Sequence, residues 1–329
     1  MVQLLEVREL YLHYADRLGN VHAVDGVSFA LEGRGQALGI VGESGSGKTS
    51  LALAIMRMLP DNVARFEGEV FLEGRESAHL PEAALRQEIR WRKIALVPQG
   101  AMNSFNPVLR VGEQVIEPLL VSGQADRRSA RRRAEELLAL VGLPGEVYDR
   151  FPHELSGGMK QRAMIASALI MSPALAILDE PTSALDVSVQ AQITNLLKRL
   201  KQELRLSILF ITHDIAVASD VCDCLAVMYA GELVEWGSAE QVLTTPAHPY
   251  TQKLLASVPR LRGPERPAFI PGAPPDLRQP PPGCRFHPRC AQATRRCQHE
   301  PPPIFQPRPG QRVRCWLPAA GANGYVACA

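Results

Sequence analysis

Short apolar runs recur along the chain and alternate with longer segments of helical periodicity. Runs of four to six residues, rich in Ile, Leu and Val, are typical of strands buried on both faces of a parallel sheet. The predicted strands are Ala37–Val41, Ile94–Val97, Leu175–Leu178, Ser207–Thr212 and Leu225–Met228. The segment Ser188–Arg205 repeats Ile and Leu at helical spacing, which predicts a helix packed along one face. This alternation predicts an α/β fold.

Two regions depart from the alternation. The first 35 residues and the segment Gly68–Glu73 have the pattern of strands in a separate antiparallel sheet. Residues from about 100–165 are mostly helical in pattern and predict a helical subdomain.

Composition changes near Pro246. Of the 27 prolines, 18 lie between Pro246 and Pro318, so we expect neither a regular helix nor a central strand in this tail. The tail also holds Cys284, Cys290, Cys297 and Cys315. We predict a large domain over residues 1–257 and a small, Pro/Cys-rich extension over residues 258–329. The extension contains the four-cysteine cluster and should be held together by something other than a large apolar core.

The chain has 329 residues, 46% of them hydrophobic, and a net charge of +2, which is ordinary for a globular protein. This balance gives no general attraction to nucleic acid. The sequence contains no run of about 18 apolar residues, so we predict no membrane span. The N-terminus lacks the pattern of a signal peptide. We therefore expect a cytosolic protein whose seven cysteines are reduced thiols or metal ligands.

The segment Gly42–Thr49 has the sequence GESGSGKT, which fits the pattern GxxxxGK[ST]. It follows the predicted strand Ala37–Val41 and precedes a helix-like segment, as a phosphate-binding loop requires. Its backbone N–H groups and the helix N-terminus would bind phosphate oxygens. Lys48 would reach the β- and γ-phosphates, and the Thr49 hydroxyl would bind Mg²⁺. The sequence thus predicts binding of ATP or GTP.

Two carboxylates follow another predicted strand, because Leu175–Leu178 leads directly into Asp179 and Glu180. An aspartate at the end of a buried strand can hold Mg²⁺, directly or through water. The glutamate after it can polarise a water molecule for attack on the γ-phosphate. Such acids could instead cap the next element, but the phosphate loop upstream favours the catalytic interpretation.

A serine and two glycines open a predicted helix in Leu155–Arg162, whose sequence is LSGGMKQR. Ser156 could be a helix N-cap, and the segment also suits an anion-binding helix N-terminus. Together with the two motifs above, it resembles the signature of ABC-type ATPases. The resemblance extends to Gln99, to Ser183–Asp186 and to His213. It implies a P-loop NTPase core with an antiparallel β subdomain and a helical signature subdomain.

The resemblance also implies the roles of individual residues. The implied catalytic residues are Glu180, His213 and Gln99, and the implied magnesium ligands are Thr49, Gln99 and Asp179. Tyr14 would stack on adenine, with Tyr11 as the competing candidate. The implied nucleotide contacts are Tyr14, Gly42, Glu43, Ser44, Gly45, Ser46, Gly47, Lys48, Thr49, Ser50, Gln99, Asp179, Ser156, Gly157 and Gly158. The last three would complete the ATP site of a second, facing ATPase.

Three further stretches resemble the oligopeptide/dipeptide importer ATPases within that family. They are Gly100–Pro107, His248–Leu255, and Gly283–Cys290 together with Cys297 and Cys315. This resemblance implies that ATP hydrolysis, with Mg²⁺, powers peptide import at the cytoplasmic face of the cell membrane. The implied partners are a second homologous ABC ATPase in a heterodimer, two multispanning permeases and an extracytoplasmic peptide-binding protein. The cargo stays open, because related systems transport nickel, glutathione or modified peptides.

The four tail cysteines have the spacing C-x5-C-x6-C, with 17 residues before the fourth. Because no C-x2-C pair is present, a simple zinc ribbon is disfavoured. Four thiolates can hold a [4Fe–4S] cluster, and the resemblance implies one. Zinc and free thiols are the alternatives, and His287 and His299 are possible substitute ligands. Cys222 and Cys224 are predicted to be small core residues, whereas Cys328 carries no signal.

A second class of function is a soluble ABC ATPase that acts on nucleic acid, with the cysteine tail as a metal-bound binding module. The arginines of Arg127–Arg133 could indicate binding to nucleic acid or to anionic lipid. Glu135 and Glu136 follow directly, however, so a solvated helix face is the favoured interpretation of this run. The sequence shows no long coiled-coil insertion and no second ATPase domain. We therefore predict an importer subunit with no nucleic-acid partner.

Overall fold

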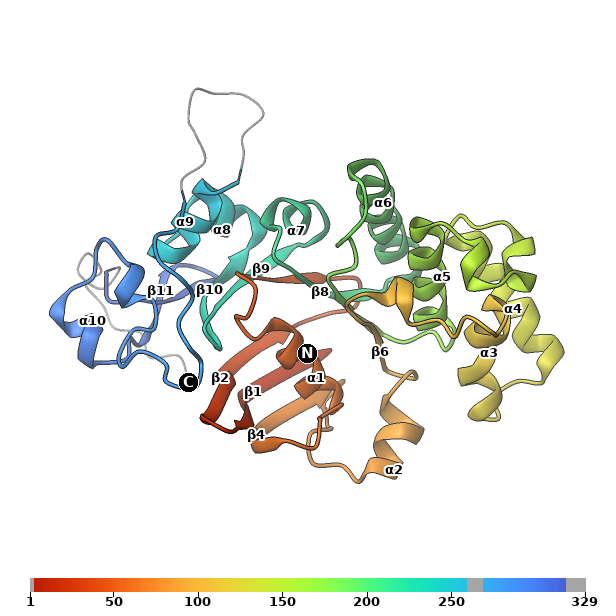
Figure 1. The fold of residues 1–329 in the computed structure, drawn as a ribbon, viewed down its shortest axis with the longest axis horizontal. Coiled ribbons are helices and arrows are strands. Elements are labelled where there is room, and N and C mark those ends of the chain that lie inside the picture. Colours follow the sequence, from red (N-terminus) through yellow and green to blue (C-terminus); the bar gives the residue numbers. More distant parts are fainter. Residues whose placement is uncertain (1–2, 259–268, 318–329) are drawn as a thin grey trace. The chain divides into compact units, whose positions relative to one another are not determined.

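The computed structural model describes residues 3–258 and 269–317. Contacts within the chain divide it into two compact units, each made of several chain segments. Figure 1 labels the helices and strands along the chain. Unit 1 contains the described residues up to 5, residues 31–37 and residues 71–211. Unit 2 contains residues 6–30, residues 38–70 and the described residues from 212 onward.

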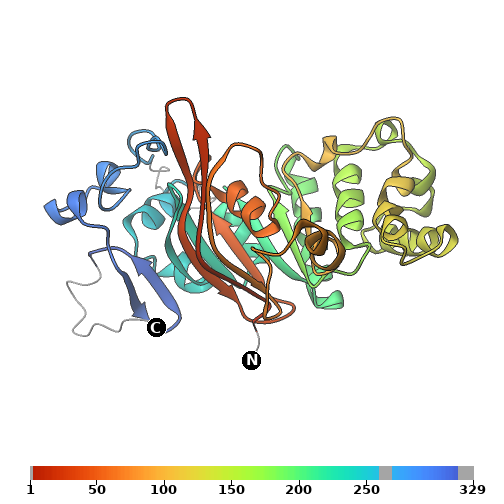
Figure 2. The ribbon, with the colours of Figure 1, turned by 90° about the horizontal axis from the view of Figure 1, so that it is seen from below.

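A sheet of long strands belongs mainly to unit 2. β1 (Leu5–Asp16), β2 (Gly19–Leu31) and β4 (Val63–Leu72) lie in the order β2–β1–β4, and the short β5 (Arg75–Glu76) pairs antiparallel with the end of β4. Figure 2 shows the long red β1 and β2 side by side. The separate antiparallel sheet predicted from the first 35 residues and Gly68–Glu73 is confirmed, although β4 begins earlier, at Val63.

A second group of strands in unit 2 positions the phosphate loop. β3 (Ala37–Val41) is buried throughout and runs parallel to β9 (Cys224–Tyr229). β10 (Glu232–Ser238) pairs antiparallel with β9 on one side and with β12 (Gln311–Arg314) on the other. β12 in turn pairs antiparallel with β11 (Ile304–Arg308). The helices of this unit are α1 (Lys48–Met56), α7 (Ile215–Val221), α8 (Ala239–Thr244), α9 (Pro249–Ala256) and α10 (Arg295–His299), with a 3-10 turn at His287–Arg289.

The expectation of no helix and no central strand in the proline-rich tail is wrong. α9 begins with Pro249 in its first turn, where a missing N–H costs nothing. β12 lies between β10 and β11 and pairs with both. Its residues include no proline, whereas Pro307 lies in β11, at the end of the strand order, where a proline is tolerated.

Unit 1 contains a parallel group of strands and a helical region. β7 (Leu175–Asp179) pairs in parallel with β6 (Ile94–Val97) and with β8 (Ser207–Thr212). The helices are α2 (Glu82–Ala84), α3 (Val111–Val121), α4 (Arg127–Leu140), α5 (Gly157–Leu169) and α6 (Val187–Leu204). A π-helical turn at Leu85–Ile89 and 3-10 turns at Ala101–Asn103, Gly145–Asp149 and Pro152–Glu154 complete the unit.

Helices α3, α4 and α5 contact one another and form the predicted helical region (Figures 1 and 2). The basic run lies on α4, where exposed Arg127 and Arg131 pair with Glu113 and with Glu135. The solvated helix face predicted for this run is therefore confirmed. The five predicted strands correspond to β3, β6, β7, β8 and β9, and Ser188–Arg205 to α6.

The predicted domain boundary after residue 257 lies beside residues 259–268, which are outside the described residues. Unit 2 contains parts of both predicted domains, so the division into 1–257 and 258–329 stays a prediction. Cys222 is buried as expected, but Cys224 is exposed at the start of β9, so the core position predicted for it is wrong. Cys328 lies outside the described residues. None of the helices in the described part of the chain has the length and hydrophobicity needed to cross a bilayer.

Candidate functional site

The predicted phosphate loop, Gly42–Thr49, connects β3 to α1. Lys48 is the first residue of α1 and is only 6% exposed. Its ammonium donates hydrogen bonds to the carbonyl oxygens of Gly42, at 2.8 Å, and of Glu43, at 2.9 Å. The loop therefore curls around the charge that the sequence assigns to phosphate binding.

Close packing explains two of the loop glycines. A Cβ atom on Gly42 would lie 2.1 Å from the carbonyl oxygen of Met228. A Cβ atom on Gly47 would lie 1.9 Å from the carbonyl oxygen of Ala23, and the φ of Gly47 is +105°. Both positions therefore require glycine. Elsewhere in the loop, Ser44, Gly45 and Thr49 are exposed, Glu43 and Ser50 are half-buried, and Ser46 is buried.

Tyr14 and His213 belong to the same unit as the phosphate loop. Tyr14 lies half-buried on β1, and His213 is exposed after β8. The competing Tyr11 hydrogen-bonds to Glu9 at 3.3 Å, and the guanidinium of Arg65 lies 3.9 Å from the centre of its ring. A ring face that is covered by arginine is less available to adenine, which favours Tyr14.

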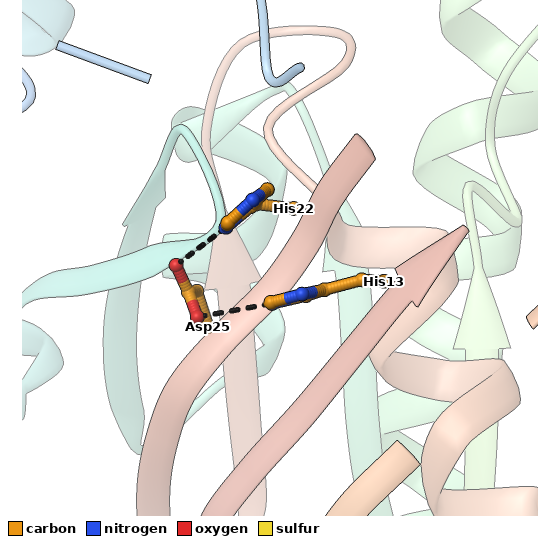
Figure 3. Close-up of side chains that lie close together, drawn as sticks. All are labelled: His13, His22 and Asp25. Atoms are coloured by element: carbon orange, nitrogen blue, oxygen red, sulfur yellow. Dashed lines mark hydrogen bonds and ion pairs between the residues drawn. The ribbon is translucent and has the colours of Figure 1, made fainter. Parts of the chain in front are cut away.

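A cluster beside Tyr14 was not predicted from the sequence. His13 on β1 and His22 and Asp25 on β2 converge, as Figure 3 shows. The Asp25 carboxylate is hydrogen-bonded to His13 Nε2, at 3.1 Å, and to His22 Nδ1, at 3.2 Å. Arg285 of the tail donates to the same carboxylate.

Burial raises the pKa of Asp25, but Arg285 and the two histidines outweigh burial and hold the pKa of this carboxyl below its usual value. The ligand atoms of the cluster lie within 4.8 Å of one another, as in a metal site. Because a guanidinium already binds the carboxylate, we interpret the cluster as an anchor for the tail and not as a metal site.

The two predicted catalytic carboxylates lie at the end of β7. Asp179 is 2% exposed, and Glu180 follows it with a φ of +52°, in the left-handed region. The Glu180 amide donates to the carbonyl oxygen of Ile211 on β8, at 2.9 Å, which holds the residue in place. Strained backbone of this kind is concentrated at functional sites.

The remaining predicted motifs of unit 1 are Gln99 and the Ser156 segment. Gln99 is exposed after β6. The Ser156 hydroxyl accepts a hydrogen bond from the Met159 amide at 3.3 Å, so its predicted role as N-cap of α5 is confirmed. A Cβ atom on Gly158 would lie 2.7 Å from Val189 of α6, so this glycine also serves packing.

The predicted nucleotide residues therefore fall into two groups. The phosphate loop, Tyr14 and His213 belong to unit 2, and Gln99, Asp179, Glu180 and Ser156–Gly158 belong to unit 1.

The four tail cysteines, predicted as one cluster, line a single pocket in unit 2. Its walls are Cys284, Cys290, Cys297 and Cys315 together with His248, Phe286 and Trp316. The Cys284 amide donates to the Cys297 carbonyl oxygen at 2.8 Å, which closes the loop that carries the first three thiols. Cys315 directly follows β12, so the tail strands bring the fourth thiol to the others.

Burial, with a smaller contribution from the neighbouring thiols, raises the pKa of the Cys284 thiol to about 12 and that of the Cys315 thiol to about 11. Four clustered thiols can ionise together only if a cation compensates their charge. The donor set therefore fits a thiolate-bound metal centre.

His248 adds a polar group to this pocket. The residue is 1% exposed, and its Nδ1 accepts a hydrogen bond from the Tyr250 amide at 3.0 Å. Burial lowers the pKa of His248 to about 3, so the ring is neutral. We assign the proton to Nε2, which has no hydrogen-bond partner among the described residues. A buried N–H donor suits an acceptor such as a thiolate or a sulfide.

Comparisons with known proteins agree with the motifs. Residues 24–183 match the family model described as "ABC transporter", and residues 234–297 match "Oligopeptide/dipeptide transporter, C-terminal region". The chain is 44% identical to the oligopeptide transport ATP-binding protein OppD of Bacillus subtilis (strain 168) over 322 residues, which is 96% of this chain and 89% of that protein. OppD of Haemophilus influenzae is 45% identical over 98% of this chain and 100% of its own length.

The chain belongs to the oligopeptide/dipeptide transporter family of ABC ATP-binding subunits. A solved dimeric ATP-binding cassette, MJ0796, bound to ADP and Pi after hydrolysis, confirms the fold. Its TM-score is 0.63 at 30% identity, covering 71% of this chain and 98% of that one. As a family member, the chain is an ATPase that uses ATP with Mg²⁺.

The alternative of a nucleic-acid ATPase with a metal-binding tail is not supported. The segment that would form its binding module overlaps the match to the C-terminal region of oligopeptide/dipeptide transporters, and the relatives are transport proteins.

Sequence reasoning missed the residues that tie the tail to the rest of unit 2. Arg285 and Arg289 lie between the first two cysteines of the segment 284–297, the cysteine loop. Two arginines between metal-ligand candidates were the sequence signal that could have indicated acidic partners. Their acidic partners lie 260 and 246 positions away in the chain, so no local pattern identifies them. His248 begins the segment His248–Leu255, and the resemblance of this segment to importer ATPases gave no indication that His248 lines the cysteine pocket.

Proposed function

We propose that this chain hydrolyses ATP to power the import of dipeptides or oligopeptides through a partner ABC permease. The observation that carries the proposal is the combination of a complete set of ABC motifs with the oligopeptide/dipeptide-type tail in one chain. The two OppD relatives are oligopeptide transport ATP-binding proteins, and the similarity covers 89% and 100% of their lengths. This supports peptides as the class of cargo.

In the proposed reaction, Lys48 binds the β- and γ-phosphates from the centre of its loop. Thr49, Gln99 and Asp179 hold Mg²⁺, directly or through water. Glu180 polarises the attacking water, and its fixed backbone supports a precise orientation of the carboxylate. His213 contacts the γ-phosphate, and Tyr14 stacks on adenine. The other proposed nucleotide contacts are Gly42, Glu43, Ser44, Gly45, Ser46, Gly47, Ser50, Ser156, Gly157 and Gly158.

We propose a heterodimer with a second, homologous ABC ATPase. In it, Ser156–Gly158 of each subunit would complete the nucleotide site of the other, because the exposed helix N-terminus of α5 can bind phosphate oxygens. ATP would then favour the closed pair, and hydrolysis would release it. The pair would act at the cytoplasmic face of the membrane with two multispanning permeases and an extracytoplasmic peptide-binding protein.

We propose that the cysteine pocket holds a [4Fe–4S] cluster through Cys284, Cys290, Cys297 and Cys315. A tetrahedral zinc site would place its thiolates about 3.8 Å apart, since Zn–S bonds are about 2.3 Å long. Among the described residues, the four sulfurs do not form a group within 4.8 Å, although they line one pocket. A four-iron cluster separates its ligands further, because each thiolate binds a different iron, and it supplies electron transfer when bound. The His248 N–H would then donate toward sulfur.

The test is reconstitution of the chain in proteoliposomes with its second ATPase, both permeases and the binding protein. We expect peptide-loaded binding protein to stimulate ATP hydrolysis and Glu180→Gln to remove the stimulation. Stimulation by nickel-loaded or glutathione-loaded binding protein, with none by peptide, would replace the proposed cargo. An assembly that hydrolyses no ATP under any condition would refute the proposal.

A further inference from the structure

Arg289, in the cysteine loop of the tail, is fixed by hydrogen bonds from all sides of its guanidinium. Its Nη1 and Nη2 donate to the two carboxylate oxygens of Glu43, at 2.6 Å and 3.0 Å. Its Nη1 also donates to the Tyr229 hydroxyl, at 3.3 Å, and its Nε to the Pro271 carbonyl oxygen, at 2.8 Å. The side chain is 5% exposed. A partly buried, bidentate pair of this kind is among the strongest polar contacts in proteins.

Glu43 is the second residue of the phosphate loop, and every polar group of this residue is held. Its amide donates to the Tyr250 hydroxyl at 2.9 Å, and its carbonyl oxygen accepts from Lys48 at 2.9 Å. Its carboxylate binds Arg289. Two of these three contacts come from the C-terminal part of the chain, so that part helps to set the shape of the loop.

An aromatic cluster makes this connection rigid. Tyr229 and Tyr250 pack with ring centres 4.6 Å apart, and Phe286 lies 5.2 Å from Tyr229 and 5.3 Å from Tyr250. All three side chains are at most 1% exposed. Phe286 stands in the cysteine loop between Arg285 and Arg289. The cysteine loop is therefore connected to the phosphate loop through closely packed, buried side chains, which leave little room for movement between the two.

A carboxylate in a phosphate loop is unfavourable for binding a polyanion. Glu43 brings a negative charge into the loop that receives the triphosphate, and like charges repel more strongly at a partly buried site than in bulk water. The guanidinium of Arg289 compensates this charge. A guanidinium stays protonated in proteins, so the compensating charge is present at every physiological pH.

We propose that Arg289 is a positioning residue for ATP binding, which neutralises Glu43 and turns its carboxylate toward the tail, away from the bound phosphates. The proposal rests on ATP binding by the phosphate loop. Since Arg289 directly precedes Cys290, whatever orders the four thiols also orders Arg289. The state of the cysteine pocket would thereby act on the affinity for ATP.

The experiment is a double-mutant cycle on the full chain, measured as the dissociation constant of Mg-ATP by equilibrium titration. Arg289→Gln should raise the dissociation constant about tenfold in the wild-type background, because Glu43 is left uncompensated. The same substitution in the Glu43→Gln background should change it less than about twofold, because no charge remains to compensate.

Arg296→Gln is the matched control. Arg296 also precedes a pocket cysteine and pairs with a glutamate, Glu300, at 2.7 Å, but that pair lies within the tail. The Arg296→Gln variant should bind Mg-ATP with the wild-type dissociation constant. An equal loss of affinity from Arg289→Gln in both backgrounds would overturn the proposal, since it would indicate general damage to the tail. No loss in either background would also overturn it.

Lys48→Ala separates this inference from the ATP site itself. If Lys48→Ala binds ATP normally, the phosphate-loop assignment fails and the inference fails with it. If Lys48→Ala loses ATP and Arg289→Gln does not, only the role of Arg289 is refuted.

Discussion

The phosphate loop and the cysteine pocket belong to the same unit, yet they are built by opposite means. The loop is closed by neighbours in sequence, because Lys48 binds carbonyl oxygens five and six positions before it. The cysteine loop is tied to the rest of the unit by distant partners, because Arg289 and Arg285 bind acids 246 and 260 positions away.

The two regions should therefore respond differently to substitution. The phosphate loop carries its chemistry in a short motif, so the largest losses of ATP binding should come from substitutions within it, and smaller ones from its distant contacts. A tail that is anchored at long range depends on residues scattered over the chain, and it can transmit its own state to them. The predictions below test this contrast, beginning with the largest expected effect.

Lys48→Ala should weaken ATP binding at least about 100-fold, because the phosphates lose a buried positive charge and two loop carbonyl oxygens lose the hydrogen bond from Lys48. Equilibrium titration with Mg-ATP measures the change. Lys201→Ala on α6 is the control and should bind as the wild type does. Unchanged affinity in Lys48→Ala would contradict the local construction of the site.

Glu180→Gln should bind ATP and hydrolyse it about 100-fold more slowly, since the amide cannot accept the proton of the attacking water. Single-turnover hydrolysis and nucleotide titration on the same preparation separate the two steps. Normal turnover would show that another group is the base.

Cys290→Ser should remove the iron and the visible absorbance of anaerobically purified protein, because the cluster loses one ligand. It should also weaken Mg-ATP binding several-fold, less than Arg289→Gln does, through the loop that both residues share. Cys224→Ser, at an exposed cysteine outside the pocket, is the matched control. Wild-type protein that contains zinc or no metal would refute the cluster.

His248→Gln should change the pH dependence of stability. The pKa of His248 in the folded protein, about 3, lies below the ordinary value of 6.5, so the unfolded chain binds more protons between these values. The contribution of His248 to the free energy of unfolding is therefore fully present above pH 6.5 and decreases as the pH drops below that value. Between pH 7.5 and 5.5, Tm should fall about 2–4 °C less in His248→Gln than in the wild type.

The exposed His79→Gln is the control for that measurement and should follow the wild type. An identical decrease of Tm in the wild type and in His248→Gln would contradict the neutral, buried state of His248.

Local patterns were enough to locate the five predicted strands and the nucleotide motifs. Apolar runs located β3, β6, β7, β8 and β9, because a strand buried on both faces needs continuous hydrophobicity. GESGSGKT identified the phosphate loop, because glycines and a lysine at fixed spacing satisfy local backbone and charge requirements. The family assignment followed from such motifs and was confirmed.

The organisation of the tail depends on contacts between distant segments, which no local pattern reports. Proline content argued against a strand there, yet the proline-free Gln311–Arg314 forms β12, because β10 and β11 supply its hydrogen-bond partners. The pairing of Arg289 with Glu43 depends on distant segments. The same holds for the position of His248 in the cysteine pocket, where its Nε2 has no hydrogen-bond partner in the described part of the chain. Motifs report chemistry within a few residues, whereas the energy of a buried charge depends on whatever the fold places beside it.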